Sequence, residues 1–215
     1  MADITETGWE LNPAEIHSGF DSDAFLAEPR SPGTHQSDVI RDLENIIIKP
    51  GQRRPDTERT DEDMATLNRY RELGMMWEII LEAAFKRRRV DGLDPKRFLR
   101  QVEIEQDEIF KTIDAIHIPD WRVLEYKLTF RSMGRASLDR IESEFWSWFT
   151  QLKGNCYGHG TRLASLFVFW VNGTYHPPIP MTKRYDIIFE ERELIDNWGM
   201  ITQHRDTMRR EGRLK

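Results

Sequence analysis

The stretch EIFKTIDAIHIPDWRVLEYK, residues 108–127, decides how this chain folds. Apolar and β-branched residues fill both of its halves, and Pro119-Asp120 between them is a turn signal. The pattern predicts a hairpin of two antiparallel strands. If the hairpin folds symmetrically about that pair, its register places Asp114 directly opposite Glu125.

Lys127 stands two residues after Glu125, so both side chains share one face of the predicted strand. Like charges opposite each other destabilise a sheet, and a cation between them would reverse that effect. Carboxylate oxygens are the ligands that Mg²⁺ prefers. Asp114 and Glu125 are therefore candidate metal ligands, and Lys127 is a candidate stabiliser of developing negative charge. The alternative is a solvated cluster in which Lys127 screens both acids.

The rest of the chain predicts helices and strands around this hairpin. In order, they are a helix over 60–89, a strand over 100–105, the hairpin, a helix opening at 137, a buried strand over 163–171, a strand over 184–189 and a helix over 190–210. A shorter helix is expected over 37–48. This order is typical of an α/β sandwich around a mixed sheet, in which a crossover helix follows an antiparallel meander.

Two of these helices carry polar residues that are candidates for the same site. Glu78 stands beside Trp77, close to the apolar stripe of its helix, and is placed to point inward; the alternative is a solvated glutamate. Gln151 and Asn155 lie one turn apart near the end of the helix that opens at 137.

A helical Glu78, a strand Asp114, a Glu125-x-Lys127 pair on the next strand and a helix bearing Gln151 resemble the PD-(D/E)XK nuclease superfamily. The resemblance covers residues 69–171 and is strongest to the RecB-like and lambda-exonuclease-like branch and to small phage-encoded members. It implies a restriction-endonuclease-like α/β/α sandwich.

The resemblance also implies roles for individual residues. The implied metal ligands are Glu78, Asp114, Glu125 and the backbone carbonyl of Tyr126, and the metal is Mg²⁺, with Mn²⁺ as a substitute. Lys127 would orient the attacking water or stabilise the pentacovalent phosphate, and Gln151 would support the site. Two positions depart from the family pattern: Ile113 precedes Asp114 where the family is named for proline, and Asn155 stands where a tyrosine is common.

The function implied is a metal-dependent DNA nuclease, an exonuclease of phage origin that hydrolyses phosphodiester bonds in DNA recombination, repair or replication. One alternative is a structure-specific endonuclease of the same fold. Another is an inactive nuclease-fold module for DNA binding or assembly. A single-strand-binding or annealing protein of a phage is a candidate partner, and the oligomeric state stays open.

Charge is uneven along the 215 residues. The net charge is −6, yet residues 1–64 hold 15 acids and 6 bases, so the remainder is mildly basic and suits a phosphate backbone. Residues 1–36 predict an extended or flexible acidic arm, and 37–215 a single nuclease domain. The lone Cys156 and the lack of a membrane-spanning stretch favour the cytoplasm, which would be the host's if a phage encodes the protein.

Several residues are candidates for DNA contact. The cations at the end of the helix over 60–89 either meet phosphates or form a solvated helix end, and Trp146 is the best candidate for an exposed aromatic because Phe145 and Trp148 follow core spacing. The candidates are Lys86, Arg87, Arg88, Trp146, Asn155 and Tyr157.

Overall fold

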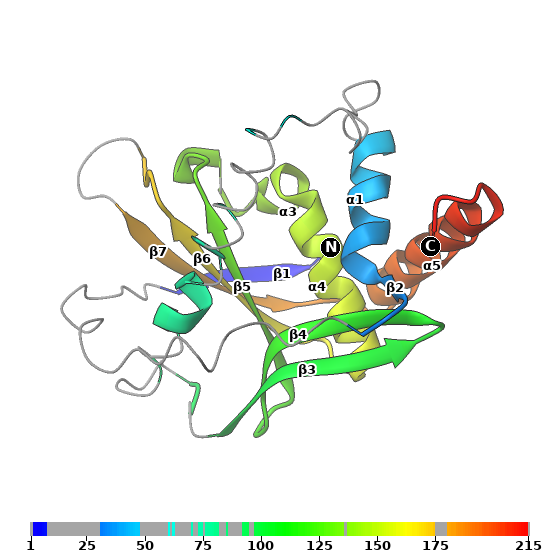
Figure 1. The fold of residues 1–215 in the computed structure, drawn as a ribbon. Helices are drawn as coiled ribbons and strands as arrows, with labels where there is room; N and C mark the ends of the chain where they lie inside the picture. The colour runs from blue at the N-terminus through cyan, green and yellow to red at the C-terminus, as the bar shows by residue number, and fades with distance from the viewer. Residues whose placement is uncertain are drawn as a thin grey trace.

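The computed structural model describes residues 2–7, 31–47, 97–135, 137–174 and 180–214, together with residues 60, 62, 70, 73, 74, 76–81, 85 and 92–94 (Figure 1). Its strands are β1 (Asp3–Thr7), β2 (Thr34–His35), β3 (Phe98–Gln106), β4 (Ile109–His117), β5 (Arg122–Thr129), β6 (Leu163–Trp170) and β7 (Met181–Ile188). Its helices are α1 (Gln36–Ile47), α3 (Ile141–Glu144), α4 (Trp146–His159) and α5 (Glu191–Arg210).

The strands that the structure describes form one mixed sheet. Its order is β1-β7-β6-β5-β4-β2, and β3 also pairs with β4. Strands β5 and β6 run parallel, with α3 and α4 between them in the chain, while β3, β4 and β5 form the antiparallel meander. The predicted α/β sandwich around a mixed sheet is confirmed.

The apolar run at 163–171 forms β6, which is buried on both faces as expected. Leu166 packs in the core beneath α4, and its neighbour Phe167 packs in the core of the opposite face. Both side chains are fully buried. Because successive side chains of a strand point to opposite faces, this strand joins the two halves of the core.

Helices cover both faces of the sheet. On one face α4 packs over the sheet, with α1 and α5 beside it. On the other face the described helical residues 76–81 cover the sheet (Figure 1), and Trp77 and Leu81 pack in one core cluster with Tyr126 and Phe167. None of the helices in the described part of the chain is long and apolar enough to cross a membrane.

The helix predicted to open at residue 137 differs from the structure. Helix α3 begins at Ile141, and the backbone leaves helical geometry at Phe145, with φ −122° and ψ 41°, before α4 begins. The Phe145 ring is buried, stacks on Trp148 at 4.3 Å between ring centroids and meets Trp170 edge-on. The break turns this aromatic group toward the sheet.

Parts of the expected N-terminal arm belong to the sheet. Strand β1 pairs antiparallel with β7, and β2 pairs with β4. Residues 8–30 lie outside the described residues, so the predicted boundary at residue 36 stays a prediction.

We expect truncation of the buried strand to cost far more stability than truncation of a surface position. Leu166→Ala should lower the free energy of unfolding by about 2–5 kcal/mol, because it leaves a cavity in the central strand. Leu99→Ala is the matched control, since Leu99 on β3 is 44% exposed, and it should cost about 0.5 kcal/mol. Urea denaturation measures both, and equal losses would contradict the central position of β6.

Candidate active site

The predicted hairpin register is confirmed. Residues 118–121 form the turn, and Ala115 pairs with Leu124 in the predicted alignment. The regular pairing of β4 with β5 ends at that pair, however. Asp114 and Glu125 come one step further along, where the two strands no longer form regular backbone pairs.

The pairing of β4 with β3 is interrupted at the same residue. Arg100 pairs with Ala115 and Val102 with Ile113, but the intervening positions, Gln101 and Asp114, are not paired. Gln101 has a φ of +47°, a conformation that is uncommon outside glycine. Asp114 therefore lies where β4 leaves regular pairing with both neighbours.

Along β3 and β4, the side chains also switch from one face of the sheet to the other at this point. Ile113 packs in the core beneath α4, whereas Ala115 packs in the core of the other face, although residues two apart on a regular strand share a face. On β3 the same change separates Phe98 from Val102. The site thus occupies a local twist where side chains from both helical layers can approach.

Asp114 uses its carboxylate to complete the hydrogen bonding of the sheet. The backbone N–H of Tyr126 donates to Oδ2 of Asp114 at 2.7 Å. A buried backbone N–H needs a partner, and here a side chain supplies it where the strand pairing has opened. This contact fixes the position of the acid.

Glu125 is buried and has its own partners. Nζ of Lys127 lies 2.6 Å from Oε1 of Glu125 in an ion pair. Nδ2 of Asn155 donates to Oε2 of Glu125 at 3.0 Å, and Nζ of Lys127 donates to Oε1 of Gln151 at 3.0 Å. The predicted shared face of Glu125 and Lys127 is confirmed, and α4 holds both ends of the pair.

The charges of the site act on one another. The pKa of Asp114 is raised well above its usual range by loss of water, then by the nearby charges of Glu125 and Glu78, against the opposing effects of Lys127 and the N–H of Tyr126. Burial alone would lower the pKa of Lys127, but Glu125 and Asp114 outweigh it, so that pKa is raised. Lys127 therefore stays a cation at neutral pH.

Glu78 approaches from the opposite helical layer. It is helical and half-buried, and Nε2 of Gln101 donates to its Oε2 at 3.3 Å. Its effects on the pKa values of Asp114 and Lys127 place it within electrostatic range of both groups. Gln101, on the distorted strand, links this helix to the site.

The donor set suits a hard divalent cation. The acids supply oxygens, and burial together with the charges of Glu125 and Glu78 raises the pKa of Asp114 despite the nearby ammonium of Lys127. In the described part of the chain, no three His, Cys, Asp or Glu side chains are grouped closely enough to hold a metal ion. Mg²⁺ is commonly bound by one or two carboxylates and keeps several waters, so Asp114, Glu125 and the Tyr126 carbonyl form a sufficient set.

The residues predicted to contact DNA lie in different environments. Asn155 is fully buried against Glu125, so it is a support of the site and not a surface contact. Tyr157 stacks on Trp198 of α5 at 5.5 Å between ring centroids. Trp146 is half-buried at the start of α4. The predicted contacts Lys86, Arg87 and Arg88 lie outside the described residues.

Sequence reasoning missed two supporting residues. Gln101 of β3 lies opposite Asp114 of β4 in the strand register, and this position is the only feature of the sequence that points to Gln101. Gln36, the first residue of α1, donates from Nε2 to the carbonyl of Gln151 at 2.9 Å. A Cβ on Gly154 would lie 2.3 Å from that Nε2, so a larger residue here would displace the Gln36 amide.

Comparisons with known proteins add little to this geometry. No family model and no curated protein matches the chain. Among solved structures, the crystal structure of SSO0001 is similar with a TM-score of 0.45 and 14% identity, over 84% of this chain and 80% of that one. A phage-related exonuclease from Haemophilus somnus 129PT is similar with a TM-score of 0.45 and 13% identity, over 84% of this chain and 86% of that one.

Replacing Asp114 with its neutral isostere should stabilise the metal-free protein at neutral pH. In Asp114→Asn the amide oxygen can still accept the N–H of Tyr126, while the repulsion from Glu125 and Glu78 is removed. The unfolded wild type loses this proton near its ordinary pKa of about 3.9, and the folded form holds it to higher pH. Wild-type stability therefore falls as pH rises from about 4 through the raised pKa, and the advantage of the variant grows over that window.

Thermal melting in EDTA between about pH 4 and pH 9 measures this difference. Glu125→Gln is the control, because it removes the partner of the Lys127 ammonium and should not stabilise the protein. An Asp114→Asn effect that is independent of pH would show that the acid is not under electrostatic strain.

Proposed function

We propose that the protein is a divalent-metal-dependent nuclease that hydrolyses phosphodiester bonds in DNA. The supporting observation is the convergence of Asp114, Glu125, Lys127 and Gln151 at one interruption of the sheet. Asp114, Lys127 and Gln151 stay partly accessible above the buried Glu125. A substrate can therefore reach the acid and the ammonium, while the support beneath them is shielded from water.

Within this proposal, Asp114, Glu125 and the Tyr126 carbonyl would hold Mg²⁺ or Mn²⁺, and Glu78, the further ligand that the sequence resemblance implies, would add negative charge from the neighbouring helix. Such an ion polarises a phosphate oxygen and lowers the pKa of a bound water. No nucleophilic side chain is then required of the protein.

Lys127 has a role that follows from its partners. Glu125 and Gln151 hold its Nζ in place, and its raised pKa keeps it protonated. A permanently charged ammonium stabilises the negative charge that develops on a phosphate and cannot serve as the general base. Asn155 acts one step further away, since it orients the carboxylate of Glu125.

The finer assignment, an end-directed exonuclease of a phage working in the cytoplasm in recombination, repair or replication, rests on the sequence resemblance. A DNA-binding module without catalysis is the second candidate. It is favoured by the closed Lys127–Glu125 ion pair and by the lack of a three-residue metal cluster among the described residues. Cleavage assays separate the two.

Single substitutions in this set should abolish cleavage and spare the fold. We expect Asp114→Ala, Glu125→Ala and Lys127→Ala each to slow Mg²⁺-dependent cleavage by about 10²-fold or more, since each removes a ligand or a charge that acts on the transition state. Because the three residues act as one unit, their separate losses of activity should not add in the triple variant. Glu105→Ala, an exposed acid on β3, is the matched control and should retain wild-type activity.

The assay compares linear with covalently closed circular DNA, in Mg²⁺, Mn²⁺ and EDTA. Degradation from the ends of linear DNA alone supports the exonuclease assignment, and nicking of circles supports an endonuclease. Binding without cleavage by the wild type in either metal would favour the inactive module.

A further inference from the structure

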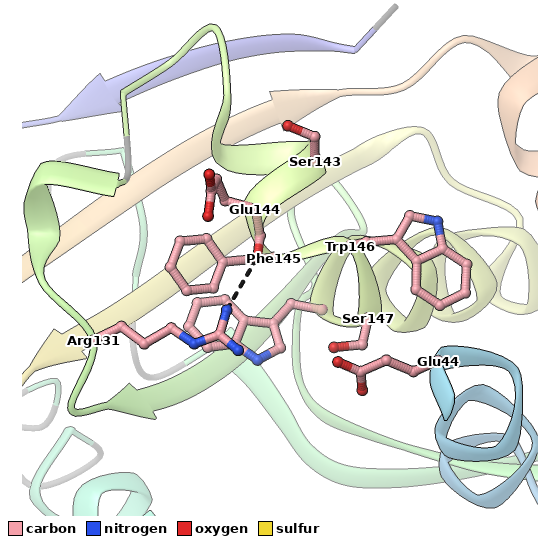
Figure 2. Close-up of a pocket in the computed structure, with 8 residues that line it drawn as sticks. Glu44, Arg131, Ser143, Glu144, Phe145, Trp146 and Ser147 are labelled. Atoms are coloured by element: carbon pink, nitrogen blue, oxygen red, sulfur yellow. Dashed lines mark hydrogen bonds between the residues drawn. The ribbon is translucent and has the colours of Figure 1, made fainter. Parts of the chain in front are cut away.

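A cavity lies near the candidate active site, lined by residues of α4 and of the chain leaving β5. It has a volume of about 270 Å³ and sits at the break between α3 and α4, bordered by α1 and by the chain leaving β5 (Figure 2). The residues that matter here are Glu44, Arg131, Glu144, Phe145, Trp146 and Trp148. This volume is just below the lower bound for ligand pockets, about 300 Å³, and has room for one small planar group.

The cavity is built on the same elements of the fold as the candidate active site. Ser147, which lines it, is four residues before Gln151 on α4, so the two share a helix face at a separation of about 6 Å along the axis. Arg131 follows Lys127 by four residues on the segment that continues β5. The cavity therefore lies beside α4 and the chain leaving β5, the two elements that carry Gln151 and Lys127.

The lining combines aromatic surface with hydrogen-bonding groups. Arg131 and Trp146 lie on opposite sides of the cavity, and the carboxylate of Glu44 points between them toward Ser147 (Figure 2). Trp148 stacks on Phe145, and both of these residues and Trp146 line the cavity. Aromatic side chains of this kind are stacking platforms for nucleobases.

The charges of the lining argue against a phosphate as the occupant. The carboxylate of Glu44 points into the cavity, whereas the Glu144 side chain points away from Arg131 (Figure 2), so the one guanidinium is offset by one carboxylate and the lining offers a phosphate no net positive charge. The guanidinium of Arg131 donates to the carbonyl of Glu144 at 3.2 Å and lies 5.5 Å from the Phe145 ring centroid. A neutral base needs no net positive charge, and its exocyclic amino group can donate to a carboxylate.

We propose that this cavity binds one unpaired nucleobase of a DNA strand whose backbone runs through the active site, and that it prefers a base with an exocyclic amino group. This inference rests on the proposed function, because it assigns the cavity to the same substrate. Stacking involves Trp146, and Glu44 accepts the hydrogen bond from the amino group.

The test is equilibrium binding of fluorescent single strands in EDTA, measured by anisotropy. The probes are short oligo-dC, oligo-dT and a strand of equal length in which abasic sites replace the bases. We expect the wild type to bind oligo-dC best and the abasic strand worst. Trp146→Leu, which keeps apolar volume, should weaken oligo-dC binding about tenfold and leave abasic binding unchanged.

Two further variants complete the test. Trp121→Leu removes another tryptophan, 52% exposed at the β4–β5 turn, and should behave as wild type. Glu44→Gln should reduce the preference for dC over dT about fivefold or more, because thymine lacks the amino group. Equal oligo-dC affinity in Trp146→Leu and Trp121→Leu, or equal loss for oligo-dC and the abasic strand, would overturn the proposal.

Cleavage measured on the same proteins separates the two hypotheses. A wild type that cleaves DNA while Trp146→Leu shows no base-dependent loss of binding refutes the base pocket alone. A wild type that never cleaves, but binds with the predicted dependence on Trp146 and Glu44, refutes the nuclease and supports the pocket.

Discussion

The hydrogen bond from the backbone N–H of Tyr126 to the carboxylate of Asp114 is the contact on which the rest of the site depends. It occurs where β4 leaves regular pairing with both β3 and β5. A break in the middle of a sheet would normally leave backbone groups unsatisfied at considerable cost. Because an acid fills this role, the same distortion that opens the sheet also fixes a carboxylate at the opening, in reach of both helical layers.

The two acids of the hairpin differ in how well their charges are compensated. Glu125 is neutralised by Lys127 and bonded to Asn155, whereas Asp114 receives one backbone N–H and the repulsion of two acids. A single ammonium cannot compensate all three carboxylates. Burial and these two neighbouring acids raise the pKa of Asp114, so its ionised form is disfavoured in the metal-free fold, and a bound divalent cation would favour it.

Helix α4 connects the features on the sheet. Its middle and later turns present Gln151 and Asn155 to the charged pair, and its first turn lines the neighbouring cavity. The break at Phe145 sets where that first turn begins. Gln36 of α1 holds α4 through the carbonyl of Gln151, beside Gly154, where a larger residue would displace the Gln36 amide. One helix, anchored on its outer side, thus aligns the reacting groups with a surface for the substrate.

The sequence by itself determined the hairpin, its register and the buried strand β6, because alternation, a Pro-Asp turn and a continuous apolar run are local signals. It also placed Glu125 beside Lys127, since two residues on one strand must share a face. Only the tertiary structure decided that regular pairing ends at Asp114, that Gln101 bridges to Glu78 and that Asn155 is buried. Those outcomes depend on the opposing strands and helices, which impose a conformation on Gln101 and Asp114 that no pattern of neighbouring residues encodes.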